Sequence, residues 1–242
     1  MFSEFKKIKK KSSTVLSYWL SISDLMASIL IIFILFFILK VNSESKIKRV
    51  YDVLFIKQLE IVEELKEKFR DNKNVTVLDD GTIFFFISEK GEMDTWFERG
   101  NWELKDNAKQ ILKEFAPQYL DILISKTNLE EIDIEKIIVE GHTDRTRFKG
   151  AKTELENYLY NLQLSQQRAF SVSKFIQEEV ILSDSVQALL QKRLTANGRS
   201  YVIPFLNSDG IVDSALSRRV EFKFKLDWEK AFKETQTSKS QL

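Results

Sequence analysis

The stretch Ile134-Glu-Lys-Ile-Ile-Val139, which continues directly as Glu140-Gly-His-Thr-Asp144, decides the fold of this chain. It predicts a buried β-strand that ends in a polar loop. Helices are predicted on either side of it, over residues 104–124 and 162–180. Further strands are predicted at residues 75–78, 82–88, 194–196 and 220–226. Helices that alternate with strands over about 150 residues predict an α+β sandwich, with helices on one face of a mixed sheet.

The first two of these strands are predicted to form a β-hairpin. Asp79-Asp80-Gly81 lies between them, and Gly81 has the backbone freedom that a tight turn requires. The three aromatic residues that follow are expected to lie in the core rather than on a binding surface: Phe84, Phe85 and Phe86.

An apolar stretch near the N-terminus predicts a membrane anchor. Tyr18–Leu39 holds one charged residue, Asp24, and would span ~33 Å as a helix at about 1.5 Å per residue. Five lysines precede it, which by the positive-inside rule places the N-terminus in the cytoplasm: Lys6, Lys7, Lys9, Lys10 and Lys11. We therefore predict a cytoplasmic segment over residues 1–17 and a transmembrane helix over residues 18–41. A cleaved signal peptide is the alternative, although its apolar core is usually shorter and no convincing small-x-small cleavage site follows Leu39.

The charge within the apolar stretch is the candidate functional residue of the membrane segment. A carboxylate at this depth costs about 2.5–3.5 kcal/mol on insertion scales, which indicates a use. Ser17, Ser21, Asp24 and Ser28 are separated by four, three and four residues, so they form one polar stripe on a helix. Asp24 could there take up and release a proton or a sodium ion. The alternative is that Asp24 is hydrated near the cytoplasmic interface and only orients the helix or hydrogen-bonds a partner.

The string Trp19-Leu-Ser-Ile-Ser-Asp24-Leu-Met-Ala-Ser resembles the transmembrane signature of the MotB family, the B subunits of ion-driven motors. The four residues between Trp19 and Asp24 resemble the ZorB subunits of Zorya anti-phage systems slightly more closely than flagellar MotB. The resemblance implies that Asp24 is the ion carrier. It also implies a bacterial inner-membrane location and a homodimer inside a ring of MotA-like or ZorA-like membrane subunits, five around two copies of this chain.

Residues 42–74 are predicted to form a helical connector. Its apolar positions recur at three-to-four spacing from Ile47 to Phe69, and charged side chains occupy the other faces. The apolar stripe packs either on the outer domain or on a second copy of itself. At the other end of the chain, residues 227–242 are polar and are predicted to form a frayed tail.

Four motifs occur in register after the connector: Phe97-Glu-Arg-Gly100-Asn-Trp-Glu-Leu104, Val139-Glu-Gly141-His142-Thr143-Asp144, Asn161-Leu-Gln-Leu-Ser165-Gln-Gln-Arg168-Ala169 and Ser217-Arg218-Arg219-Val220-Glu221. Together they resemble the OmpA-like peptidoglycan-binding domain over about residues 75–226. The resemblance implies that Asp144 and Arg168 face each other across a cleft that binds the diaminopimelate of the peptidoglycan stem peptide.

The chemistry of these two residues suits that ligand. Diaminopimelate has an ammonium group, which can donate hydrogen bonds to the Asp144 carboxylate. It also has carboxylates, which Arg168 can bind with two parallel hydrogen bonds. Arg168 lies in the first half of the helix predicted over residues 162–180, so backbone N–H groups near that helix start are expected to add to carboxylate capture. Thr143 and Asn161 are candidate auxiliary hydrogen-bonding partners. The alternative is that Asp144 and Arg168 form a structural ion pair.

The remaining motif residues have supporting roles. The resemblance implies that Arg218 braces the binding loop, whereas Arg219 is equally compatible with a solvated surface. His142 is interpreted as a loop-orienting residue. Two departures from the family pattern are an insertion over residues 145–160, which is expected to lid or reshape the cleft, and Ala196, where an earlier glycine is usual.

Composition mainly removes other functions. Lys and Arg number 37 against 36 Asp and Glu, so no global field indicates a nucleic-acid partner. The absence of Cys excludes disulfides and thiol catalysis, and a single His leaves no His-based metal cluster. We therefore expect that the protein is not an enzyme and that it uses no cofactor apart from a translocated ion. The leading hypothesis is the B subunit of an ion-driven rotary motor in anti-phage defence; the alternatives are a flagellar stator subunit and a passive cell-wall tether.

Overall fold

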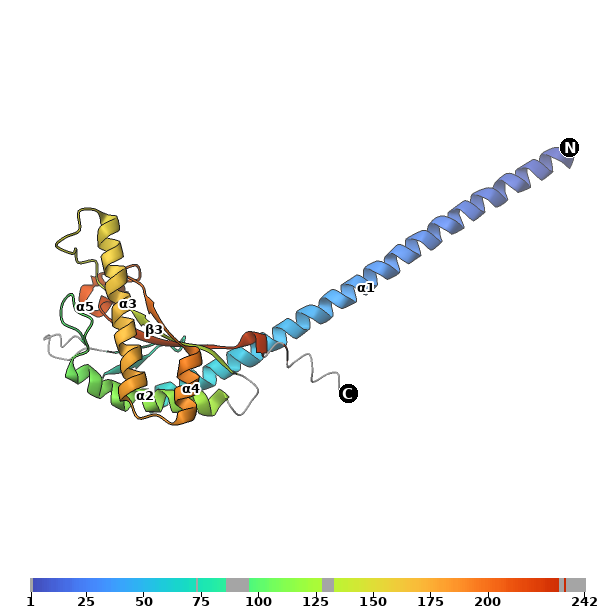
Figure 1. Ribbon diagram of the computed structural model, residues 1–242. Coiled ribbons are helices and arrows are strands. Elements are labelled where there is room, and N and C mark those ends of the chain that lie inside the picture. The colour runs from blue at the N-terminus through green and yellow to red at the C-terminus, as the bar shows by residue number, and fades with distance from the viewer. Residues whose placement is uncertain (1, 73, 86–95, 128–132, 231–232, 234–242) are drawn as a thin grey trace. The chain divides into compact units, whose positions relative to one another are not determined.

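The computed structural model describes residues 2–72, 74–85, 96–127, 133–230 and 233 (Figure 1). The chain divides into two compact units, Met1–Arg49 and Val50–Leu242. The first unit is helical, and the second contains the sheet and the remaining helices.

Helix α1 runs from Phe2 to Lys68 without an interrupting glycine or proline. From Tyr18 onward it includes one stretch long and apolar enough to cross a membrane, and no part of that stretch is buried inside the protein. Asp24 lies within it with an exposed side chain. The Ser28 hydroxyl donates to the Asp24 backbone carbonyl at 2.8 Å, one helical turn away.

The C-terminal part of α1 belongs to the core of the second unit. Ile61 and Leu65 are fully buried, and Phe69, just past the helix end, packs its ring 5.1 Å from that of Phe115. The sequence left open whether this stripe packs on the outer domain or on a second copy. For these three residues the partner is the outer domain, whereas Tyr51 and Phe55, nearer the membrane stretch, are exposed.

Five strands form the main sheet, in the order β1-β2-β7-β3-β4. Their bounds are Val75–Val77 for β1, Ile83–Phe85 for β2, Ile134–Gly141 for β3, Leu194–Gly198 for β4 and Val220–Leu226 for β7. All neighbours are antiparallel except β3 and β4, so the sheet is mixed. A separate two-stranded sheet pairs β5 (Phe205–Leu206) with β6 (Val212–Asp213). The predicted α+β architecture is confirmed.

The two faces of the sheet differ in chemistry because side chains alternate along each strand. Val139 pairs with Phe222 in the β3–β7 register, and both are buried in the apolar core. Glu140 pairs with Glu221 one step along, on the opposite face. The helices of this unit are α2 (Asp106–Thr127), α3 (Glu154–Glu179), α4 (Asp184–Arg193) and the short α5 (Ser214–Ser217). In Figure 1, α3 runs across the sheet beside β3.

Two glycines allow α3 to lie directly on the strands beneath it. A Cβ atom on Gly141, at the end of β3, would lie 2.1 Å from the Ser165 carbonyl oxygen. One on Gly198, at the end of β4, would lie 2.6 Å from the Gln166 nitrogen. Helix and sheet therefore meet backbone to backbone beside the loop that follows β3.

Several boundaries differ from those predicted. α2 begins at Asp106 rather than 104, because Leu104 forms an antiparallel bridge with Phe97. α3 begins at Glu154 rather than 162, because Thr153 caps it. The elements α4, α5, β5 and β6 were not predicted.

Gly81 takes the expected left-handed conformation, with φ +84°. Phe84 and Phe85 are buried as predicted, and Phe86 lies outside the described residues.

Candidate functional site

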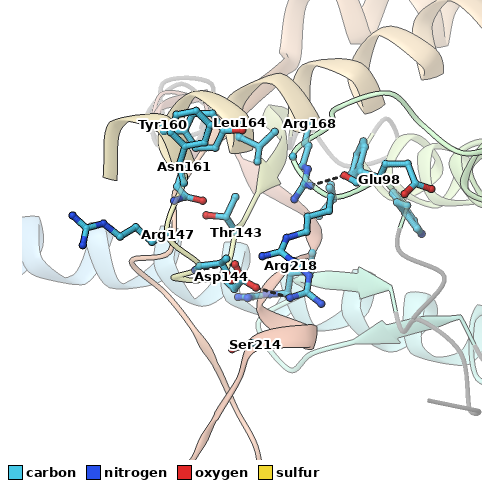
Figure 2. A pocket seen from close by; sticks show the side chains of 18 of the residues that line it. Glu98, Thr143, Asp144, Arg147, Tyr160, Asn161, Leu164, Arg168, Ser214 and Arg218 are labelled. Atoms are coloured by element: carbon cyan, nitrogen blue, oxygen red, sulfur yellow. Dashed lines mark hydrogen bonds and ion pairs between the residues drawn. The ribbon is translucent and has the colours of Figure 1, made fainter. Parts of the chain in front are cut away.

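The five residues proposed for the outer site line one cavity of about 790 Å³ in the second unit (Figure 2). The loop after β3 supplies Thr143 and Asp144, and the middle of α3 supplies Asn161 and Arg168. Arg218 follows α5, and the loop over residues 96–100 closes another side. The structure therefore brings together all five residues proposed for the outer site.

Asp144 is held by an arginine from the last motif. Arg218 Nη1 donates to its Oδ2 at 2.5 Å, and the Thr146 backbone N–H donates to its Oδ1 at 3.1 Å. Burial alone would raise the pKa of the Asp144 carboxyl, but these hydrogen bonds outweigh it and hold the pKa below its ordinary value. Asp144 is thus a carboxylate, and Arg218 fixes its orientation.

Arg168 is buried and held by neutral groups. Its Nε donates to the Asn101 carbonyl at 3.0 Å and its Nη2 to the Glu98 carbonyl at 3.3 Å (Figure 2). The guanidinium lies 5.0 Å from the centre of the Phe97 ring. Burial first, and the charge of Arg218 second, lower the pKa of Arg168 to about 10, so it stays charged at neutral pH. Since a guanidinium has five N–H donors, bonds remain for a ligand.

The carbonyls that hold Arg168 were not foreseen, although their motif was recognised. The loop that carries them turns at Gly100, which has φ +74°. A sequence pattern signals that this loop exists, but which backbone carbonyls point inward depends on its path.

The two auxiliary residues, Asn161 and Thr143, differ in the hydrogen bonds that their side chains form. Asn161 Nδ2 donates to the Asn157 carbonyl at 3.0 Å, back along α3. Thr143 is 2% exposed, and its hydroxyl has no hydrogen-bonding partner among the residues that the structure describes. Its backbone N–H donates to the Ser200 carbonyl at 2.9 Å, which fixes the loop. A buried hydroxyl of this kind is unusual, because most buried polar atoms are bonded.

The expected helix start before Arg168 is wrong. α3 begins at Glu154, so Arg168 lies near the middle of the helix. Backbone N–H groups there bond to carbonyls of the preceding turn and cannot capture a carboxylate. Charge at this position comes from the Arg168 guanidinium itself.

The insertion over residues 145–160 has two parts. The first part brings Thr146, Arg147, Phe148 and Lys149 to the wall of the cavity. The second part forms the first turns of α3, where Tyr160 stacks on Phe148 with ring centres 3.9 Å apart. The signal missed in the sequence is a capping box, since Thr153 Oγ1 accepts from the Glu156 N–H and the Glu156 carboxylate accepts from the Thr153 N–H. The insertion thus forms one side of the cavity.

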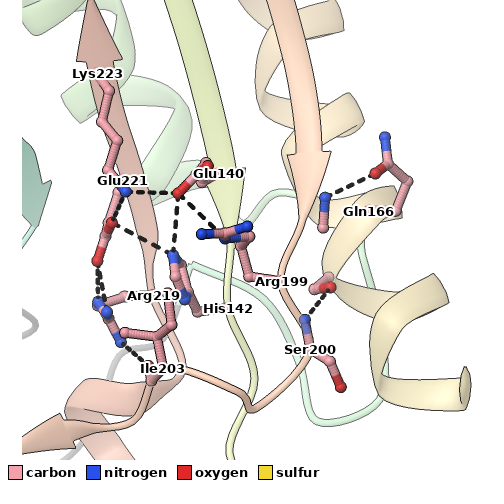
Figure 3. A network of polar contacts seen from close by, with 11 residues as sticks. Glu140, His142, Gln166, Arg199, Ser200, Ile203, Arg219, Glu221 and Lys223 are labelled. Atoms are coloured by element: carbon pink, nitrogen blue, oxygen red, sulfur yellow. Dashed lines mark hydrogen bonds and ion pairs between the residues drawn. The ribbon is translucent and has the colours of Figure 1, made fainter. Parts of the chain in front are cut away.

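Beside the cavity, His142 belongs to a buried charge network on the face of the sheet opposite the apolar core (Figure 3). It is 1% exposed, with Nε2 3.4 Å from Glu221 Oε2 and 3.9 Å from Glu140 Oε2. Lys223 Nζ lies 2.5 Å from Glu140 Oε2 and 2.8 Å from Glu221 Oε2. Arg219 Nη2 lies 2.5 Å from Glu221 Oε1, and its side chain is 7% exposed, so its position is not a solvated one.

This network is the one group among the described residues whose ligand atoms could surround a metal ion. The fit is poor, because the Lys223 ammonium already lies between the two carboxylates and Arg219 neutralises Glu221 further. Burial lowers the pKa of His142, and the nearby Glu221 only partly opposes it. His142 is therefore a neutral side chain that packs between balanced charges. Its backbone N–H donates to the Arg219 carbonyl at 2.9 Å, which ties the loop to β7.

Comparisons with known proteins show which proteins this chain resembles. Residues 96–202 match the OmpA family model. The Zorya protein ZorB of Escherichia coli is 30% identical over 224 residues, which cover 90% of this chain and 91% of that protein. Among solved structures, a MotB-like protein from Desulfovibrio vulgaris is 20% identical, covers 73% of this chain and 94% of its own, and superposes with a TM-score of 0.45. The cell wall anchor of the type VI secretion system of Pseudomonas aeruginosa is 20% identical over 66% of this chain and 94% of its own, with a TM-score of 0.38.

Proposed function

Since the chain belongs to the family of the Zorya protein ZorB, we propose that it is the B subunit of an ion-driven rotary motor. In this proposal it is anchored to peptidoglycan and acts in Zorya-type anti-phage defence. The observation that carries the proposal is the combination, in one chain, of a carboxylate in the apolar stretch of α1 and a charged cleft in an OmpA-like domain.

The anchor rests on the chemistry of the cleft. Asp144 has a fixed carboxylate that can accept from a ligand ammonium, and Arg168 has free N–H donors for a ligand carboxylate. Charges of opposite sign at fixed positions suit the end of a diaminopimelate side chain, where both groups occur. The ligand proposed for the cleft is therefore the peptidoglycan stem peptide, which would hold the outer domain at the cell wall.

The motor rests on Asp24. A carboxylate in a low-dielectric setting costs free energy, and its presence there therefore indicates a function. A side chain that alternates between its neutral and charged forms can carry an ion. The membrane potential supplies about 2.3 kcal/mol per elementary charge per 100 mV. One helix cannot line a pore, so membrane partners must complete it. From the resemblance to motor B subunits, the partners proposed are five MotA-like or ZorA-like membrane subunits around two copies of this chain. The N-terminus lies in the cytoplasm and the outer domain in the periplasm of the bacterial inner membrane.

Two other functions use the same parts. A flagellar stator subunit would have the same membrane carboxylate and wall anchor. A passive wall tether would need only the anchor. The identity to ZorB along 90% of the chain favours the defence motor over both.

The test of the proposal is Asp24→Asn, introduced into cells that carry the native gene cluster. The change keeps the shape of the side chain and removes its charge, so protection against phage, measured as plating efficiency, should be lost. Asp52→Asn makes the same chemical change at an exposed position on the same helix, outside the apolar stretch, and should protect like wild type. Full protection by Asp24→Asn would refute the motor and leave the tether.

A further inference from the structure

A smaller hollow of about 110 Å³ adjoins the cleft. Tyr160 and Leu164 line both, and they lie together on α3 at the edge of the larger cavity (Figure 2). The other residues that line the hollow are Trp102, Gln163 and Gln167. These five side chains are uncharged, whereas the cleft is lined by charged groups of both signs. The hollow therefore suits a neutral group attached to the charged one that the cleft binds.

The two sites lie on adjacent faces of α3. Leu164 and Arg168, one turn apart, line the cleft, and both are buried. Gln163 and Gln167 immediately precede them, so they occupy the next face of the helix. Gln163 is exposed and Gln167 partly exposed, and their side-chain amides form no hydrogen bond with any residue that the structure describes. Two amides, each with donors and an acceptor, are thus available to a ligand.

Trp102 forms a fixed aromatic wall of the hollow. Its side chain is 44% exposed, but its backbone is held in place. The Trp102 N–H donates to Asn101 Oδ1 at 2.7 Å, and the Asn101 carbonyl accepts from Arg168. The antiparallel bridge between Phe97 and Leu104 closes the same loop. Because the loop is already ordered, contact with this indole costs a ligand little conformational entropy.

An aromatic ring beside amide groups has the chemistry that binds a sugar. The C–H groups of a pyranose ring pack on an aromatic face, while its hydroxyl and acetamido groups form hydrogen bonds with amides. A hollow of about 110 Å³ has room for an acetamido group, with the sugar ring on the aromatic rim. An apolar side chain of a protein partner would also fill the hollow, but it would leave both glutamine amides unused.

The position of the hollow also fits the ligand proposed for the cleft. A lactyl group and two residues separate diaminopimelate from the N-acetylated sugar that carries the stem peptide. Three such units reach about 10 Å at about 3.3–3.6 Å each. The next face of a helix ~10–12 Å in diameter lies within that distance. A stem peptide bound at Arg168 can therefore place its sugar at Trp102.

We propose that this hollow, the Trp102 subsite, binds the N-acetylated sugar to which the stem peptide is attached. The inference rests on the proposed peptidoglycan anchor and extends it from the peptide to the glycan strand. Trp102 packs against the sugar ring, and Gln163 and Gln167 bind its acetamido and hydroxyl groups. The domain then holds a stem peptide together with its own sugar.

Calorimetry on the full-length chain, in a detergent without a sugar headgroup, compares two ligands. These are the free stem tripeptide that ends at diaminopimelate and the same tripeptide attached to its disaccharide. The contacts of the Trp102 subsite should make the disaccharide tripeptide bind at least about tenfold more tightly than the free tripeptide. A disaccharide tripeptide without its N-acetyl groups should lose most of that advantage.

Variants of the subsite should change this ratio and not the affinity for the free tripeptide. Trp102→Ala should bring the ratio close to one, and Gln163→Ala should reduce it at least about threefold. Gln163→Ala places a better helix former at an exposed position of α3, so it preserves the fold. Trp228→Ala removes an exposed indole outside both linings and should keep the wild-type ratio.

The outcomes separate the subsite from the anchor. Equal affinity of the wild-type chain for the two ligands would overturn the Trp102 subsite and leave the peptide anchor standing. An unchanged ratio in both Trp102→Ala and Gln163→Ala would overturn the subsite as well. If the wild-type chain bound neither ligand, the anchor would fall and the subsite with it.

Discussion

Gly141→Ala is a substitution that tests whether the cleft depends on the contact between α3 and β3. The added Cβ atom would lie 2.1 Å from the Ser165 carbonyl oxygen and 3.4 Å from the Ala169 nitrogen. Cβ atoms essentially never come within 3.0 Å of another heavy atom, so helix and strand must separate by about 1 Å. Both contacting atoms belong to the α3 backbone, which no side-chain rotation can move away.

The cost follows from this geometry. Overpacking costs about 1–3 kcal/mol, and a clash with backbone places Gly141→Ala at about 3 kcal/mol. For a domain of this size that corresponds to a fall in Tm of about 6–12 °C. Arg168 lies one turn after Ser165 on α3, so it moves with the helix and peptidoglycan binding should weaken about tenfold or more.

The assay is thermal unfolding of the full-length protein in detergent, followed by tryptophan fluorescence. The matched control is Gly210→Ala, since Gly210 has φ +74° but no atom within 4 Å of an added Cβ. Its left-handed conformation alone costs about 1–2 kcal/mol. A Tm for Gly141→Ala equal to or above that of Gly210→Ala would refute the claim that close backbone packing positions the cleft.

Three further predictions concern stability. Burial lowers the pKa of His142, so as the pH falls through about 6.5 this side chain gains a proton in the unfolded chain but stays neutral in the folded domain. The free energy of unfolding should therefore fall between pH 7 and 5.5. Urea titrations should show a smaller fall for His142→Gln. Lys223→Met leaves Glu140 and Glu221 opposed without the ammonium between them and should cost about 2–3 kcal/mol, again by urea unfolding; a loss under 0.5 kcal/mol would contradict the network. Thr153→Ala removes the cap of α3 and should cost about 1 kcal/mol, seen as a Tm lowered by about 2–4 °C, with Ser183→Ala, whose side chain makes no cap bond, as the control.

The sequence predicted the architecture where its local signals were strong. Ile134–Val139 had the composition of a buried strand, and Gly81 marked a turn that the structure contains. The start of α3 was missed because residues 154–160 are mostly polar or aromatic, and their two leucines, Leu155 and Leu159, are exposed. The capping pair Thr153 and Glu156 was the stronger signal there.

The sequence predicted which residues line the site, but not which of them form ion pairs with one another. The motifs placed Asp144 and Arg168 in one cavity, but the partner of Asp144 is Arg218, 74 residues later. The burial of His142 likewise depends on the register that sets Glu140 opposite Glu221. Such pairings need the path of the chain in space, which spacing along the sequence does not contain.

Co-sedimentation of the full-length protein with purified peptidoglycan sacculi tests the central claim most directly. Wild type is compared with Asp144→Ala and Arg168→Ala, and with Arg193→Ala as a control for loss of an arginine outside the cleft. Wild type and Arg193→Ala are predicted to sediment with the sacculi, and the two cleft variants to remain in the supernatant. Undiminished sedimentation of both cleft variants would contradict the claim that this cleft holds the cell wall.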